Sequence, residues 1–182
     1  MQANISVNRA AVLTLWAAVV AERLGFGRDE ALTLGRAVAG LNAQAKGRRL
    51  GIYKPRQDAD RKKKPPEQFL VEVCGRAVPA LDTPEGVRAS TRGKPLDPRG
   101  VQRYLEGKFG DRLPQVRAKM EALARAFEPA ELGECAYSLY EAFRPGIPSG
   151  KAGWGARGEL DLGKIAALAP ARRRRPRRAA AR

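Results

Sequence analysis

The chain begins with an apolar stretch, residues 8–24, whose bulky side chains cover more than one narrow stripe of a helix. A helix that is apolar on several sides is typical of a buried position. Ser6 or Asn8 is expected to cap its first turn through a side-chain oxygen, and Gly25 is expected to end it. The first element is therefore predicted to be a buried helix.

A second helix is predicted after the turn at 25–27, with Asp29 as its N-cap. It should run to about Lys46 and end at Gly47, because glycine is common just beyond helix C-termini. Residues 1–47 are therefore expected to form an N-terminal helical hairpin.

Two short segments rich in β-branched residues follow, 69–73 and 76–81, and turn-rich sequence continues to about residue 97. Together they predict a small β-hairpin at about 69–91. Pro79 has no backbone N–H to donate to a neighbouring strand, so it should restrict its strand to a sheet edge.

Helical spacing returns after Asp97-Pro98, a capping residue followed by a first-turn proline. Further helices are predicted over 99–109, over 113–127, from Pro129 to about Pro145, and from a cap at Asp161 to Leu168. The expected fold class is mainly α, a multi-helix globular body with a small β-hairpin and a disordered basic C-terminal tail. The predicted organisation is a hairpin (1–47), an exposed basic arm (48–66), a helical body (67–169) and an Arg-rich tail (170–182).

Positive charge is concentrated in two runs. Residues 46–64 carry a net +7 and residues 171–182 another +7, so the two runs hold 14 of the formal +16 charges. The remainder is close to neutral. A balanced body with two cationic segments is typical of a protein that binds a polyanion, and nucleic acid is the commonest polyanion in a cell.

The basic arm interleaves cations with one aromatic residue, which predicts phosphate contacts together with base stacking. Its predicted nucleic-acid-binding residues are Arg48, Arg49, Tyr53, Lys54, Arg56, Arg61, Lys62, Lys63 and Lys64. The alternative is a solvated loop kept soluble by its charges.

The tail carries arginines without any acidic residue, and the planar guanidinium grips phosphate in a bidentate manner. Its predicted binding residues are Arg172, Arg173, Arg174, Arg175, Arg177 and Arg178. Such a tail would add affinity but no sequence preference. The alternative is a tail that only solubilises or localises the protein.

Residues 20–36 resemble a helix-turn-helix, with Ala21, Gly25, Ala31 and Leu34 at that motif's spacing of small and core positions. The resemblance implies that the second helix enters the major groove of DNA and that Arg28, Thr33 and Arg36 contact base edges. The same string also resembles the first half of a ubiquitin-associated three-helix domain. The alternative is an ordinary helical hairpin with a glycine turn.

The glycine-rich segment 146–158 is not a phosphate-binding loop, because Ala152 stands where that motif has Ser or Thr. Trp154 could stack on a base or fill a groove of its own core. The high Arg and Ala content resembles that of uncharacterised bacterial proteins from GC-rich genomes, and this resemblance implies no activity.

The chain has no histidine and only two distant cysteines, which excludes His-dependent nucleophile systems and a cysteine zinc site. No catalytic constellation, metal site or cofactor is predicted. A weaker alternative is a magnesium-dependent nuclease that uses Asp58, Asp60 and Glu72.

The expected function is nucleic-acid binding, with duplex DNA favoured over RNA, in the cytoplasm and without membrane contact. The competing interpretation is a protein-interaction module whose basic tail only localises it. Self-association stays open, because an even number of copies would suit palindromic DNA.

Overall fold

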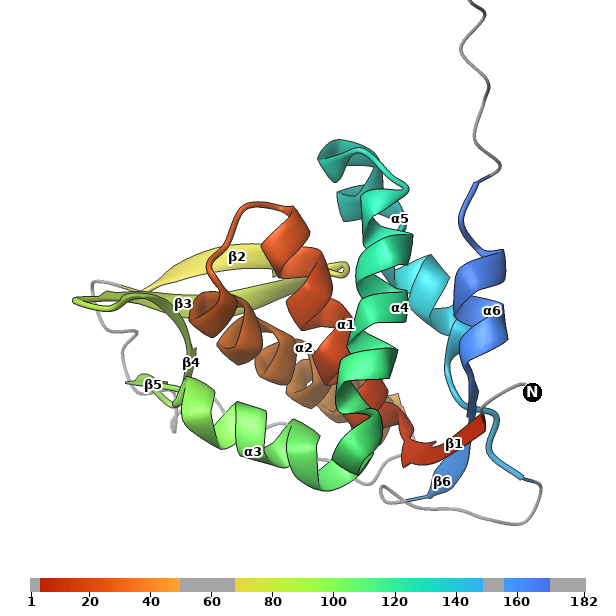
Figure 1. Cartoon of the computed structure of the whole chain (residues 1–182). Helices are drawn as coiled ribbons and strands as arrows, with labels where there is room; N and C mark the ends of the chain where they lie inside the picture. The colour runs from red at the N-terminus through yellow and green to blue at the C-terminus, as the bar shows by residue number, and fades with distance from the viewer. Residues whose placement is uncertain (1–3, 50–67, 149–155, 171–182) are drawn as a thin grey trace, which may run out of the picture.

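The computed structural model describes residues 4–49, 68–148 and 156–170. Over these residues the fold is mainly helical, as predicted, and two antiparallel sheets complete it (Figure 1). No helix in the described ranges is long and apolar enough to cross a membrane.

Helix α1 (Arg9–Arg23) is the centre of the core, since every residue from Ala11 to Ala21 is buried. Asn8 caps it by accepting a hydrogen bond from the Ala11 N–H at 2.8 Å. Its Trp16 ring meets Phe143 edge-on at 5.3 Å between centroids, and the indole N–H donates to the Ala136 carbonyl at 2.8 Å. The buried helix was predicted, and Asn8 is one of the two caps, Ser6 or Asn8, that the prediction left open.

Helix α2 (Arg28–Arg49) packs antiparallel on α1, and Gly35 permits the close approach. A Cβ at this position would lie 2.4 Å from the Thr14 carbonyl oxygen. The predicted end at Gly47 and the predicted Asp29 cap are wrong. The helix continues to Arg49, and Asp29 belongs to its first turn, where Glu30 rather than Asp29 accepts the Gly27 N–H.

A four-stranded antiparallel sheet with the order β2-β3-β4-β5 covers α2. Its strands are β2 (Phe69–Val73), β3 (Arg76–Thr83), β4 (Gly86–Thr91) and β5 (Lys94–Pro95). It is larger than the predicted hairpin, and Pro79 lies in an internal strand rather than at an edge. That prediction failed because the β3–β4 ladder begins only at Ala80↔Ala89, which leaves Pro79 unpaired on its β4 side.

The second sheet pairs β1 (Asn4–Asn8) with β6 (Arg157–Asp161), two segments from opposite ends of the chain. Neither strand was predicted. Gly158 allows a close crossing here, since a Cβ would lie 2.1 Å from the Gly146 carbonyl oxygen.

The remaining helices surround α1 and follow the predicted pattern, with Asp97 and Asp161 as caps. They are α3 (Pro98–Phe109), α4 (Leu113–Arg125), α5 (Pro129–Phe143) and α6 (Leu162–Ala167). Figure 1 shows α3 and β5 at the lower left and α5 at the upper right, with α1 and α4 between them. Two opposite sides of the body are thereby formed by different helices.

Candidate nucleic-acid interface

Helix α3 presents two arginines to solvent on the side opposite its core. Val101, Leu105 and Phe109 are buried, whereas Arg99 and Arg103 are exposed. The two arginines are four residues apart and therefore lie on one face, about 6 Å apart along the helix axis. This arrangement follows directly from the apolar spacing of the helix.

The β4–β5 turn adds two exposed cations, Arg92 and Lys94, close to the start of α3 (Figure 1). Arg92 and Gly93 have φ of 54° and 78°, so the turn is tight, and Lys94 pairs with Thr91 across it. Only Leu96 and Asp97 separate β5 from α3.

We call these four residues, Arg92, Lys94, Arg99 and Arg103, the α3 basic face. Among the described residues, none of the four side chains forms an ion pair or a hydrogen bond with another residue; the ion pairs found there belong to Arg117. None of the four is therefore held in an ion pair within the part of the chain that the structure describes, and the exposed carboxylate on α3 is Glu106, one turn from Arg103.

Two glycines lie on α3 near these arginines: Gly100 is half-buried and follows Arg99, and Gly107 is exposed one turn beyond Arg103. Gly100 and Gly107 are in the helix, have no positive φ, and would place a Cβ within 4 Å of no other atom. Glycine in a helix interior costs about 0.5–1 kcal/mol relative to alanine. The fold does not require these glycines, and they leave the helix surface beside Arg99 and beyond Arg103 without a side chain.

Tyr104 lies half-buried between α2 and α3 with two cations near its ring. The Arg36 guanidinium is 4.3 Å from the ring centroid and the Lys108 ammonium 5.7 Å. A cation over an aromatic face is electrostatically favourable. This cluster fixes the position of α3 on α2 and extends the positive charge of the interface.

The position of the β4–β5 turn depends on contacts between α2 and the edge of β4. One carboxylate oxygen of Glu30 accepts the Gly27 N–H at 2.8 Å and the other accepts the Val87 N–H at 2.7 Å. These backbone hydrogen bonds lower the pKa of the Glu30 carboxyl. Glu30 therefore remains ionised and holds the sheet that carries Arg92 and Lys94.

Thr33 provides the second such contact, and this corrects its predicted role. Its side chain is fully buried; the hydroxyl donates to the Glu30 carbonyl at 2.9 Å and accepts the Ala89 N–H at 3.0 Å. Thr33 cannot reach a base edge, because the sheet covers it. Of the other two predicted base readers, Arg28 is exposed at the start of α2 and Arg36 is stacked on Tyr104.

The described structure includes few of the other predicted binding residues. The backbone of Arg48 and Arg49 forms the last turn of α2. The remaining predicted residues of the arm and tail lie outside the described residues, as do Asp58, Asp60 and Trp154. Glu72 is exposed on β2, and no group of three metal-ligating residues occurs in the described ranges.

The opposite side of the body is acidic. Helix α5 carries Glu131, Glu134 and Glu141, all exposed, and has no lysine or arginine within its bounds. The prediction of a neutral remainder is correct in sum, and the acidic residues of α5 have no cation on that helix to balance them. A polyanion would be attracted toward α3 and repelled from α5.

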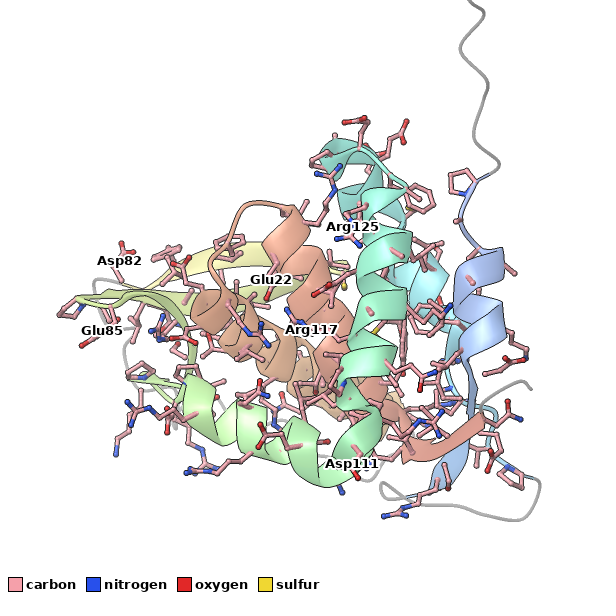
Figure 2. The ribbon with its side chains drawn as sticks, viewed as in Figure 1. Glu22, Asp82, Glu85, Asp111, Arg117 and Arg125 are labelled. Atoms are coloured by element: carbon pink, nitrogen blue, oxygen red, sulfur yellow. The ribbon has the colours of Figure 1, made fainter. Side chains whose placement is uncertain are left out.

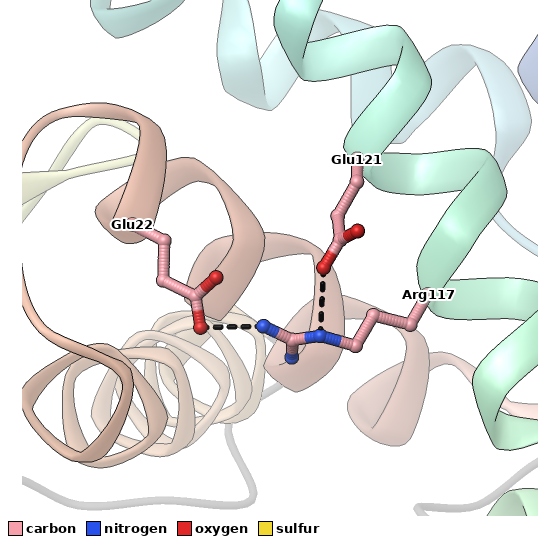
Figure 3. Close-up of polar contacts among 3 residues, drawn as sticks. All are labelled: Glu22, Arg117 and Glu121. Atoms are coloured by element: carbon pink, nitrogen blue, oxygen red, sulfur yellow. Dashed lines mark hydrogen bonds and ion pairs between the residues drawn. The ribbon is translucent and has the colours of Figure 1, made fainter.

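A buried arginine of α4 has a structural role. Arg117 of α4 pairs through its Nη2 with Glu22 of α1, and its Nε lies 2.9 Å from Glu121 (Figure 3). Figure 2 shows Glu22 and Arg117 pointing toward one another between the two helices. Since two carboxylates neutralise this guanidinium, it is not a candidate for binding phosphate.

Sequence analysis did not identify the α3 basic face. The signal is present in RGKPLDPRGVQR (residues 92–103), which carries four cations and one acid, but it is weaker than the two long runs. The chain matches no family model, and no curated protein or solved structure is similar enough to indicate a relationship.

Proposed function

We propose that this protein binds nucleic acid, preferentially duplex DNA, with the α3 basic face laid along the phosphate backbone. The observation that carries the proposal is the set of four exposed cations on α3 and the β4–β5 turn, none of which forms an ion pair with a described carboxylate. Each contact with a phosphate releases a condensed counterion, which supplies affinity at low salt.

The shape of this surface also suits a duplex. A helix of 12 residues is about 18 Å long, and the major groove admits a helix. With Gly100 beside Arg99 and Gly107 one turn beyond Arg103, the helix backbone can approach a sugar-phosphate strand closely at these two points. The exposed Arg92 and Lys94 extend the contact to neighbouring phosphates.

The arm and the tail are proposed to add further phosphate contacts, which increase affinity without sequence preference. The acidic α5 would remain on the far side from the bound duplex. A cytoplasmic location and the absence of a cofactor requirement belong to the same proposal.

The test compares two double charge reversals by fluorescence anisotropy of labelled duplex DNA, single-stranded DNA and RNA. Arg99→Glu with Arg103→Glu should weaken duplex binding at least tenfold and lower the salt slope by about two, at about 0.9 per phosphate contact. The matched control is Lys119→Glu with Arg125→Glu, which changes the net charge equally on α4; Figure 2 shows Arg125 at the end of α4 remote from Asp111 and α3.

Equal losses for the two double variants would mean that binding depends only on net charge, and the α3 basic face would be rejected. Absence of salt-dependent binding by the unaltered chain would reject nucleic acid altogether. The protein-interaction interpretation would then be tested by a pull-down that survives nuclease treatment.

A further inference from the structure

A cleft of about 260 Å³ opens between the second half of α2 and the β2–β3 turn. It is lined by Leu41, Gln44, Ala45, Gly75, Arg76 and Ala77. Pockets for drug-sized ligands hold about 300–1,000 Å³, so this one suits a small ligand or one group of a larger molecule. None of the lining residues is acidic, and one is an arginine.

Arg76 is held in place from one side only. Its Nη2 donates to the Asn42 Oδ1 at 3.0 Å, and the same oxygen accepts the Tyr137 hydroxyl at 3.1 Å. A guanidinium has five N–H donors in a planar fork. Because α5 fixes Asn42 through Tyr137, the guanidinium is anchored with most of its donors unused by described residues.

The surroundings favour an anion rather than a cation. Glu72 pairs with Ala77 across the β2–β3 ladder, whereas Arg76 pairs with Val73, so Glu72 points to the opposite face of the sheet. Cys74 is buried, and burial raises the pKa of its thiol to about 12, so it carries no charge near neutral pH.

The two polar groups of the lining come from different elements. Gln44 from α2 lines the cleft together with Arg76, and its side chain has an amide N–H₂ donor. Gly75 has φ of 71° and no atom within 4 Å of a Cβ position, so the turn leaves the cleft open at this point. The negative end of the α2 helix dipole would repel an anion, and this effect is largest in the last turn of the helix. The lining residues Leu41, Gln44 and Ala45 lie before that turn.

From these observations we propose that the Arg76 cleft binds a phosphate group, either free phosphate or the terminal phosphate of a nucleic acid. The guanidinium would grip two phosphate oxygens and Gln44 a third. The site is separate from the α3 basic face. Only the proposal that the phosphate belongs to a nucleic acid rests on the proposed function.

The test is a titration of the ¹⁵N-labelled full chain with sodium phosphate, followed by NMR at the backbone amides of residues 75–77. Sodium chloride at equal ionic strength is the reference. We expect saturable shifts with phosphate alone. Arg76→Gln should raise the dissociation constant at least tenfold, and so should Gln44→Glu, which adds a carboxylate at an exposed position without touching the core.

The matched control is Arg125→Gln, which removes one positive charge from an exposed position on α4 and should change the dissociation constant less than twofold. A specific phosphate site should saturate below about 20 mM phosphate. Absence of saturable shifts up to that concentration would overturn the proposal. Unchanged binding by both Arg76→Gln and Gln44→Glu would overturn it as well.

Two oligonucleotides of one sequence, with a 5′-phosphate or a 5′-hydroxyl, distinguish the sources. Shifts at 75–77 with the phosphorylated strand alone would identify a nucleic-acid terminus, and shifts with inorganic phosphate alone would identify free phosphate. Phosphate binding by a chain that binds no duplex would reject the proposed function and support this site. Duplex binding by a chain that shows no saturable shifts at 75–77 with either inorganic phosphate or the phosphorylated strand would reject this site alone.

Discussion

Replacing the two glycines of α3, Gly100 and Gly107, by alanine should stabilise the protein and weaken its binding to nucleic acid. A Cβ at Gly107 or Gly100 would meet no atom within 4 Å, and neither residue has a positive φ. The substitution therefore removes the entropic cost of glycine without a steric penalty, about 0.5–1 kcal/mol at each position. Gly100→Ala with Gly107→Ala should stabilise the fold by about 1–2 kcal/mol.

That gain corresponds to about 3–6 °C in Tm, measurable by thermal unfolding, since 1 kcal/mol shifts a domain of this size by about 2–4 °C. Binding is measured by anisotropy on the same duplex at fixed salt. If the helix backbone approaches the phosphate strand closely, the two methyl groups hold it away, and affinity should fall several-fold.

Gly40→Ala is the matched control, because Gly40 is also helical and open, but lies on α2. It should stabilise the protein by about 0.5–1 kcal/mol, half of the effect of the double variant, and leave the affinity unchanged. Gly35→Ala should destabilise it strongly, since its Cβ would collide with the α1 backbone. Unchanged affinity of the α3 double variant, or an equal loss with Gly40→Ala, would refute the proposed close approach.

Three further predictions concern the core and its contacts. Glu30→Gln should cost about 1 kcal/mol through the weakened acceptor for Val87 N–H. Because folding lowers the Glu30 pKa, its contribution is present above the unfolded pKa and is lost as pH falls through the folded value, so chemical unfolding of wild type and variant should converge in acid. Trp16→Phe should destabilise by about 2–3 kcal/mol in the same assay, since it removes buried volume and the hydrogen bond to Ala136. Cys74 should react with a thiol reagent only after denaturation, and reaction at the rate of a free thiol in the native protein would contradict its burial.

The helices were largely predictable because their signals are local. Apolar spacing and the capping residues Asn8, Asp97 and Asp161 define the starts of α1, α3 and α6 within a few neighbouring positions. The end of α2 was predicted wrongly because glycine ends a helix only where the backbone leaves the helical conformation, and at Gly47 the backbone stays helical. Local preference is a weak guide when the surrounding chain determines the outcome.

The sheets were harder to predict because their pairing is non-local. Strand β1 meets β6 across more than 140 residues, and nothing in NISVN alone indicates that partner. The edge position predicted for Pro79 was wrong for the same reason, since the neighbour on each side of a strand is determined by the whole fold. The α3 basic face also required the fold, because Arg92 and Arg103 come together only through the β4–β5 turn.

Thr33 shows how the helical hairpin and the sheet act together. Thr33 accepts the Ala89 N–H and Glu30 accepts the Val87 N–H, both from the edge of β4. These two side chains of α2 therefore take the place that the carbonyls of a neighbouring strand would occupy. An exposed strand edge would otherwise present these donors to other chains. The helix that resembles a DNA-reading element by sequence thus faces the sheet at this point. If the proposed function is correct, α2 contributes to binding by holding the β4–β5 turn beside α3, and it is α3 that faces the duplex.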